Sequence, residues 1–335
     1  MNTARMQASK IAIIGATGNV GRTVVEMLLA RKLVSPQQLF LYASPRSGGQ
    51  SLNLGGHIFR VEETTASSFS DALICIFTTE TPVSRTWIPT ALKAGAYVVD
   101  SSSQYRLDPT VPLIIPPVNV QLVQQKQKLY AHANCLASPI STVVAPLHQK
   151  FGVIHIDAVT YHSTAGAGKA AMDECIAETK ACFGDSSYER AIFPRQIAFN
   201  VIPQVGDIRP DGMTFEEYKI IEEIKKVVDP TLKISATCVR VPVLIGHSIA
   251  LQLEFSCEVG IEEILAILRA APSVKISPNH YSTPVEVVGS DEVWVGRVRR
   301  DISRPRSIQL WLCSDNLRRG AATDAVEIAE AILSF

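Results

Sequence analysis

A glycine pattern near the start of the chain places the tightest constraint on its fold. Three glycines recur at intervals of three residues in the segment 15–21, which reads GATGNVG. The pattern follows an apolar run at 10–14 that is typical of a buried parallel strand, and it precedes apolar residues at 22–30 with helical spacing. Glycines at this place let the backbone turn tightly and approach a pyrophosphate, which lies on the amide groups of a helix N-terminus. The pattern therefore predicts a dinucleotide site rather than a tight turn without a ligand. Its candidate contacts are Gly15, Thr17, Gly18, Asn19 and Val20.

The segment after the second predicted strand, 39–43, distinguishes the two nicotinamide cofactors. Chains that bind NAD usually carry an acidic residue there to bind the ribose 2′-hydroxyl. This chain carries none, because its segment 43–49 reads ASPRSGG. A guanidinium with two hydroxyl groups beside it suits a 2′-phosphate, so Ser44, Arg46 and Ser47 predict NADP(H) as the cofactor. The alternative for Arg46 is a solvated loop arginine.

The order of predicted elements indicates two domains of different character. Strands at 72–77 and 96–100 with a helix at 87–94 continue the alternation of strand and helix, which favours βαβ units and a parallel sheet. Beyond residue 135, β-rich stretches dominate. We therefore predict an α/β fold with a Rossmann-type NADP-binding domain plus an α+β domain whose mixed sheet is largely antiparallel. The elements expected in the second half are helices at 140–147 and 215–228, strands at 154–162, 234–241, 248–257, 292–298 and 307–313, and a helix at 317–333 that fits either domain on pattern alone.

Composition narrows the functional class. The chain has 335 residues, a length that suggests about two domains, and its 32 basic and 32 acidic residues balance. No basic block is present, so neither nucleic acid nor an anionic membrane is an expected partner. No apolar run approaches the roughly 18–20 residues that span a bilayer. The seven cysteines are odd in number and scattered, without a CxxC pair, which argues against disulfides and a zinc site and favours the cytoplasm.

One cysteine, Cys135, stands out because it follows the cofactor-binding half in the segment 130–135, YAHANC. A nicotinamide site combined with one well-placed thiol suggests a covalent thioacyl intermediate that hydride transfer reduces or forms. A buried packing thiol is the alternative reading of Cys135. The other six cysteines are interpreted as packing residues.

Short motifs along nearly the whole chain resemble the aspartate-semialdehyde dehydrogenase family. Each motif is short, and their number and order make the resemblance specific. They read GATGNVG at 15–21, ASPRSGG at 43–49, SSSQYRLD at 101–108, NC at 134–135, STAGAGK at 163–169, RQIAFNVIPQVG at 195–206, FEEYK at 215–219, RVPVLIGHS at 240–248 and SDNLRRGAA at 314–322.

The resemblance implies an activity and a set of site residues. Members of the family use NADPH to reduce aspartyl phosphate to the semialdehyde, releasing phosphate, through a thioester on a cysteine. By position, Cys135 matches the nucleophile and His247 the acid/base residue. The substrate-binding positions are then Arg240 for the α-carboxylate, Arg106 for the phosphate with Lys219 assisting, Glu216 for the amine, and Asn134 and His162 beside them.

The resemblance also implies the assembly of the chain. Asn316 matches a segment that lies against the nicotinamide, so the C-terminal helix is expected to return to the first domain. The expected boundaries are 1–133 with 316–335 for the NADP-binding domain and 134–315 for the catalytic and dimerisation domain. A homodimer formed through the second domain is expected.

The predicted chemistry asks for these residue types independently. Attack on an acyl phosphate needs a thiolate, and a histidine can take and return a proton near neutral pH. A substrate with two anionic ends suits two fixed arginines. Glu216 and Lys219 are spaced i,i+3 and share one helical face, where a solvated ion pair is the alternative.

Two departures from the family pattern lie near the nucleophile. His162 stands where the family usually has glutamine, and Leu136 stands where it usually has a hydroxyl residue. We expect Pro139 at the first position of the following helix. These departures keep two alternatives open: a catalytically silent relative that binds a nucleotide or a partner protein, and a reductase of a related acyl phosphate such as N-acetylglutamyl phosphate.

Overall fold

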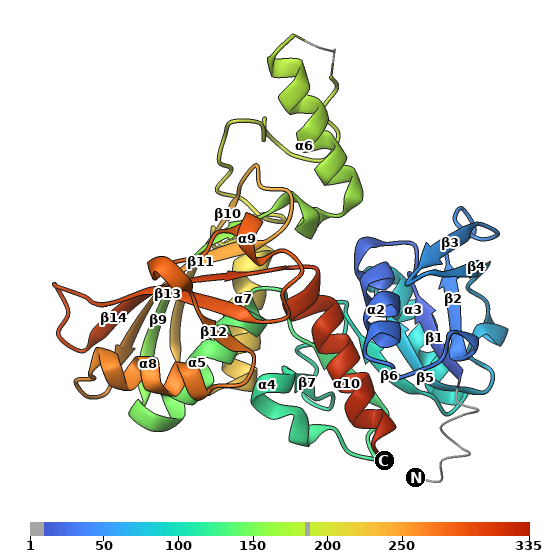
Figure 1. Ribbon diagram of the computed structural model, residues 1–335, viewed down its shortest axis with the longest axis horizontal. Coiled ribbons are helices and arrows are strands. Elements are labelled where there is room, and N and C mark those ends of the chain that lie inside the picture. The colour runs from blue at the N-terminus through green and yellow to red at the C-terminus, as the bar shows by residue number, and fades with distance from the viewer. Residues whose placement is uncertain (1–9, 185–187) are drawn as a thin grey trace. The chain divides into compact units, whose positions relative to one another are not determined.

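The structure, a computed structural model, describes residues 10–184 and 188–335. These residues form two compact units (Figure 1). The first contains residues 10–134 and 320–335, and the second contains the described residues between 135 and 319. The expected boundaries at 133 and 316 lie one and four residues from these divisions.

The first unit is built on an eight-stranded sheet whose order is β3-β4-β2-β1-β5-β6-β8-β7. All neighbouring strands are parallel except the β3–β4 hairpin. The chain proceeds from β1 to one side through β2 and then to the other through β5, so the end of β1 is a topological switch point, where doubly wound sheets bind ligands. The strands are β1 (Lys10–Ile14), β2 (Leu39–Ala43), β3 (Ser51–Leu54), β4 (His57–Glu63), β5 (Ala72–Phe77), β6 (Tyr97–Asp100), β7 (Leu113–Ile114) and β8 (Leu129–His132).

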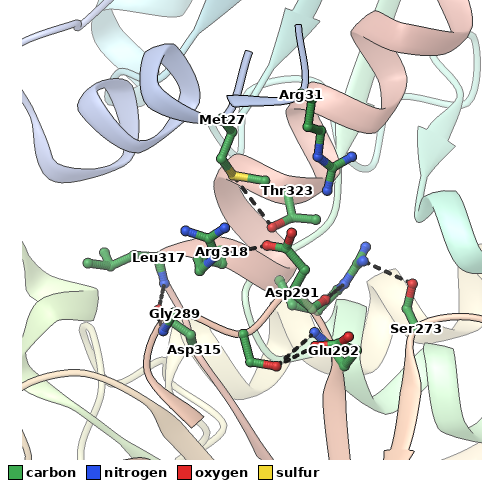
Figure 2. Close-up of polar contacts among 12 residues, drawn as sticks. Met27, Arg31, Ser273, Gly289, Asp291, Glu292, Asp315, Leu317, Arg318 and Thr323 are labelled. Carbon is green, nitrogen blue, oxygen red and sulfur yellow. Dashed lines mark hydrogen bonds and ion pairs between the residues drawn. The ribbon is translucent and has the colours of Figure 1, made fainter. Parts of the chain in front are cut away.

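The C-terminal helix α10 (Thr323–Leu333) completes the core of the first unit. Its buried alanines and aliphatic residues share one apolar cluster with helix α2 (Asn19–Ala30). Thr323 Oγ1 donates a hydrogen bond to Met27 Sδ over 3.8 Å, as Figure 2 shows. Arg31 pairs with the carboxylates of Glu327 and Glu330 at 3.7 and 3.6 Å. The remaining helices of the unit are α3 (Thr81–Lys93) and α4 (Pro116–Asn119).

The second unit is built on a six-stranded sheet of order β10-β9-β11-β14-β13-β12. Three of its five strand pairs are antiparallel, which confirms the predicted mixed, largely antiparallel sheet. Residues in β11 alternate between buried and partly exposed, so one face of the sheet is covered. The strands are β9 (Val153–His162), β10 (Lys233–Arg240), β11 (His247–Phe255), β12 (Val274–Ile276), β13 (Val293–Arg300) and β14 (Ser307–Ser314), and the helices are α5 (Ala137–Phe151), α6 (Lys169–Cys182), α7 (Phe215–Val227), α8 (Ile261–Ala270) and α9 (Pro284–Val287).

Several element boundaries differ from those predicted. Helix α5 begins at Ala137, so the prediction of Pro139 at its first position is wrong, and the buried side chains of its first turn hold it there instead of a hydroxyl cap. Helix α3 begins at Thr81, six residues before the expected start, with a proline in its first turn. Helix α6 was not predicted, because its sequence is only weakly amphipathic. Two of its carboxylates connect it to a later segment: Glu174 accepts hydrogen bonds from the backbone N–H groups of residues 191–193, and Glu178 accepts them from residues 197–198.

Three negative observations apply to the described residues. All seven cysteines lie among them, and each is a free thiol. No helix within 10–184 or 188–335 is long and apolar enough to cross a membrane. No three His, Cys, Asp or Glu side chains in the same ranges gather closely enough to hold a metal ion.

The glycine turn yields a stability prediction. A Cβ at Gly21 would lie 2.4 Å from the carbonyl oxygen of Gly15, whereas a Cβ at Gly18 would meet that oxygen at 3.4 Å, an ordinary contact. We expect Gly21→Ala to lower the free energy of unfolding by about 3 kcal/mol, because backbone atoms must move to relieve the overlap. Gly18→Ala should cost less than about 1 kcal/mol. Urea unfolding of both variants tests this, and equal costs would contradict the close approach.

Candidate active site

The glycine turn between β1 and α2 has the geometry of an anion-binding loop. Gly15 has φ +87°, and a Cβ on it would lie 2.7 Å from the carbonyl oxygen of Thr78. The amides of Gly15 and Ala16 both donate to the carbonyl oxygen of Tyr42, which ties the turn to β2. Gly18 is exposed at the N-cap of α2 and presents no side chain to an approaching group. The turn therefore fits a pyrophosphate on the N-terminus of α2.

The loop after β2, which is the predicted site of the ribose phosphate, is exposed to solvent. Ser44 and Arg46 are exposed and Ser47 is partly exposed. The amides of Ser47 and Gly48 donate to the carbonyl oxygen of Ser44, so the loop is a compact turn. This arrangement leaves the Arg46 guanidinium at the surface of the loop.

Arg106 belongs to the first unit and is almost fully buried, with 8% of its surface exposed. Its Nη2 donates to the carbonyl oxygen of Ser101 over 2.6 Å. The buried Asp100 carboxylate accepts hydrogen bonds from Ser84 and Ser102, which fixes the start of this loop. Burial, and after it the Arg106 charge, lowers the pKa of His132 to about 4, so this imidazole is neutral beside the guanidinium.

His247, at the start of β11, is held by the loop that follows β9. The backbone N–H of Ser163 donates to His247 Nδ1 over 3.0 Å. The Ser163 hydroxyl donates to Asn316 Oδ1 over 2.9 Å, and the Gly246 amide donates to the same oxygen over 2.8 Å. Three segments distant in sequence thus fix one imidazole.

This network determines where the neutral His247 ring carries its proton. A ring nitrogen that accepts an N–H bond cannot itself be protonated, so the proton lies on Nε2. That Nε2 atom is buried, and no hydrogen-bond partner for it occurs within the described part of the chain. Burial is the main cause that lowers the pKa of His247 well below its ordinary value, followed by the His162 and Arg240 charges. The ring therefore presents an N–H donor at neutral pH.

Arg240, at the end of β10, shares one space with His247. A Cβ on Gly166 would lie 3.2 Å from Arg240 Nη1 and 3.3 Å from His247 Nε2. Arg240 Nη1 donates to the carbonyl oxygen of Ser163 over 2.5 Å, and its guanidinium lies 6.0 Å from the centre of the Phe193 ring. Glycine at 166 therefore leaves room for a small ligand that contacts both groups.

His162 lies directly against His247. The two ring centres are 5.0 Å apart, and 1% of each residue is exposed. His162 Nε2 lies 2.9 Å from Thr160 Oγ1, whose hydroxyl donates to the carbonyl oxygen of Thr237. The direction of the hydrogen bond between His162 and Thr160 follows the tautomer of His162. Burial, Arg240 and Lys219 all lower the pKa of His162, so the histidine in place of the family's glutamine is neutral.

Cys135 lies two residues before the first residue of α5 and is partly exposed. Its negative form raises the pKa of Arg240, which shows that the sulfur lies within electrostatic reach of the guanidinium. Cys135 thus lies within electrostatic range of Arg240, and Arg240 shares the space beside Gly166 with His247.

Glu216 and Lys219 form an ion pair on α7 with an N–O distance of 2.9 Å. Their side chains are only 13% and 31% exposed, so the pair is not a fully solvated one. The Glu216 charge raises the pKa of both Arg240 and His247, and the Lys219 charge lowers that of His162. Both residues therefore belong to the same cluster as Cys135.

Comparison with known proteins gives the family. Residues 10–126 match the model of the semialdehyde dehydrogenase NAD binding domain, and residues 144–319 match that of the semialdehyde dehydrogenase dimerisation domain. A relative from Rickettsia conorii, named aspartate-semialdehyde dehydrogenase, is 40% identical over 97% of both chains. The chain belongs to the aspartate-semialdehyde dehydrogenase family. The predicted family and fold class are confirmed.

Other members of the aspartate-semialdehyde dehydrogenase family match equally along the whole chain. The relative from Aquifex aeolicus is 38% identical over 97% of this chain and 98% of its own. The structure of aspartate semialdehyde dehydrogenase II from Vibrio cholerae complexed with ASA superimposes with a TM-score of 0.94. That structure is 36% identical and covers 98% of this chain and 99% of its own.

The predicted site residues divide between the two units. Cys135, His162, Glu216, Lys219, Arg240, His247 and Asn316 belong to the second unit, while Arg106, Asn134 and the glycine turn belong to the first. Asn134, the residue before Cys135, is buried. Asn316 was predicted as a cofactor contact. Its side-chain amide oxygen accepts hydrogen bonds from the Ser163 hydroxyl and the Gly246 backbone N–H.

Sequence reasoning missed Ser163 and Thr160 as parts of this site. Ser163 was quoted only as the first residue of the motif 163–169, and Thr160 lies inside a strand. The available signal was their place in the sequence, because Thr160 lies two residues before His162 and Ser163 directly follows it.

The pair of histidines gives a pH prediction. In its protonated form, His162 is the second cause, after burial, that lowers the pKa of His247, so His162→Gln should raise that pKa. Protonated His247 carries hydrogen on Nδ1, which opposes the Ser163 N–H and displaces the ring. The acid limb of kcat/KM should therefore move to higher pH, so that the ratio of the rate at pH 5.5 to the rate at pH 8 falls below the wild-type ratio.

A matched control is His155→Gln, which changes a partly exposed histidine on the same strand. The measurement is the profile of kcat/KM between pH 5 and 8 for the three proteins. An acid limb in His162→Gln that coincides with the wild-type limb would show that His162 does not act on His247.

Proposed function

We propose that the chain catalyses the NADPH-dependent reductive dephosphorylation of L-aspartyl 4-phosphate to L-aspartate 4-semialdehyde, through a thioester on Cys135. The observation that carries the proposal is the convergence of Cys135, Arg240 and His247 in the second unit of a family member. Neither the silent relative nor the reductase of N-acetylglutamyl phosphate is favoured, because the relatives named above are all aspartate-semialdehyde dehydrogenases.

In the first step, the Cys135 sulfur attacks the acyl carbon and the bond from that carbon to the phosphate oxygen breaks. The thiol proton leaves with the phosphate, which departs as hydrogen phosphate. Arg240 and the N-terminus of α5 favour the thiolate that attacks. Arg106 is proposed to hold the phosphate with the help of Lys219, because a guanidinium fork suits phosphoryl oxygens.

His247 is proposed to act through its Nε2–H. The acyl oxygen gains negative charge when sulfur attacks, and a positioned donor stabilises that charge. The acid/base role expected for His247 thereby becomes the role of a hydrogen-bond donor in the resting tautomer. Arg240 holds the α-carboxylate, Glu216 the amine, and His162 and Asn134 line the substrate.

NADPH, when bound, supplies the hydride that reduces the thioester carbon. The tetrahedral adduct then expels Cys135 as a thiolate, and a proton from solvent restores the thiol. Gly15, Thr17, Gly18, Asn19 and Val20 would hold the pyrophosphate, Ser44, Arg46 and Ser47 the 2′-phosphate, and Asn316 the nicotinamide side. We also propose a cytoplasmic homodimer, supported by the match to a dimerisation domain and by the free thiols.

The thioester is tested in the reverse direction with semialdehyde, phosphate and NADP. We expect Cys135→Ser to lower the rate by at least about a thousandfold, because a hydroxyl at neutral pH is a far weaker nucleophile than a thiolate. Cys257→Ser, which changes an exposed thiol of the same unit, should keep wild-type activity. Retention of a tenth of the activity by Cys135→Ser would refute the covalent route.

The cofactor preference is tested at the loop after β2. Loss of one charge-assisted contact costs about 1.5–3 kcal/mol, so Arg46→Ala should raise the KM for NADP by roughly ten- to a hundredfold. The KM for NAD should change little, because NAD lacks the 2′-phosphate. Lys93→Ala, which removes an exposed cation from the end of α3, is the control. An equal effect of Arg46→Ala on both cofactors would contradict the role of Arg46.

A further inference from the structure

A cavity of about 360 Å³ lies in the second unit, away from the cysteine and histidine cluster. It is bounded by α8, by the segment that follows β12 and by β13. Its volume lies within the range of small-molecule sites, about 300–1,000 Å³.

The charge of the cavity is one-sided. Arg269, Arg297 and Arg299 line it together with His280, and no carboxylate is among the described residues of its wall. No ion pair of these three arginines occurs within residues 10–184 and 188–335. All three arginines are exposed, so they form a cluster of positive charge beside the cavity that attracts an anion.

The wall also holds a buried hydroxyl that lacks a partner. Ser277 is 7% exposed, and its Oγ has no hydrogen-bond partner within the described chain. Buried polar groups are nearly always satisfied, so such an atom in a cavity wall marks the place of a ligand group. A hydroxyl can donate to an anion that the guanidinium groups attract.

The backbone of the wall is held in a conformation that packing alone does not favour. Arg297 has φ +53° and His280 has φ +77°, and β13 carries an irregularity between Gly296 and Arg299. A Cβ on Gly296 would lie 2.4 Å from the carbonyl oxygen of His280, so the two segments meet backbone to backbone. Arg299 Nη1 donates to the carbonyl oxygen of Arg297, which fixes the bulge. Strained residues of this kind cluster at ligand sites.

We propose that this cavity binds a small organic polyanion, a carboxylate or phosphate compound with at least two negative charges. The arginines Arg269, Arg297 and Arg299 bind the charges and Ser277 Oγ donates one hydrogen bond. Apolar side chains on the wall, including Leu265 and Ile276, contact the carbon skeleton of the ligand. The site is separate from the reaction proposed above and does not depend on it.

Isothermal titration calorimetry with citrate and with inorganic pyrophosphate tests the site, in saturating NADP so that the cofactor loop is filled. Wild-type protein should bind at least one of the two probes, and the double variant Arg269→Gln/Arg297→Gln should bind it at least tenfold more weakly. Binding of citrate alone identifies a carboxylate ligand, and binding of pyrophosphate alone identifies a phosphate ligand.

Arg300→Gln is the matched control, because Arg300 is exposed on the same strand and does not line the cavity. It should bind as the wild type does. Cys135→Ser should also keep the affinity while losing turnover, which separates this site from the reaction. The proposal is overturned if neither probe binds the wild type, or if the double variant, shown to be folded by circular dichroism, binds with unchanged affinity.

Discussion

The hydrogen bond from the Ser163 backbone to His247 Nδ1 is the contact on which the proposed chemistry depends. It fixes the orientation of the ring and leaves Nε2–H beside Gly166, in the space shared with Arg240. A backbone donor does this without a side chain that can rotate away, and the Ser163 hydroxyl is in turn held by Asn316. The conformation of one loop thus determines the tautomer of one imidazole and, through it, which group faces the acyl oxygen.

Charged side chains near this contact change the pKa values of His162 and His247. Burial is the main cause that lowers the pKa of both histidines; Arg240 adds to it at both rings, and Lys219 adds to it at His162. Glu216 opposes that effect at His247 and pairs with Lys219. The histidine at 162 is therefore a neutral hydrogen-bonding group beside His247 and leaves the positive charge of Arg240 and Lys219 uncompensated by that ring.

Much of the fold follows from the sequence because its signals are local. The strand at 10–14 and the following glycine turn were predictable. An apolar run indicates a buried strand, and glycines directly after it indicate a tight turn, so both signals lie in adjacent residues. The start of α3 was harder to predict, because the proline in its first turn can also be interpreted as the end of a helix. Helix α6 was not predictable, because Glu174 and Glu178 stabilise it through backbone groups of a later segment.

The candidate site likewise has parts that adjacent residues predict and parts that depend on contacts between distant segments. The motif around Cys135 and the pair Gly246 and His247 identify residue types, and the resemblance to the family assigns their roles. The link between Ser163 and Asn316 spans 153 residues and joins two loops, and no spacing rule in the sequence predicts such a contact. The tautomer of His247 therefore follows from the three-dimensional structure, because the residue type alone does not determine it.

The most direct test of this account is the protonation of the His247 ring in the free enzyme. Nitrogen-15 NMR of protein labelled at histidine, at pH 7.5, reports which ring nitrogen carries hydrogen, and a His247→Gln variant assigns the signals. The account predicts a neutral ring with hydrogen on Nε2 and a lone pair on Nδ1. A neutral ring with hydrogen on Nδ1 would contradict it and would make His247 a base toward the Cys135 thiol instead of a donor to the acyl oxygen.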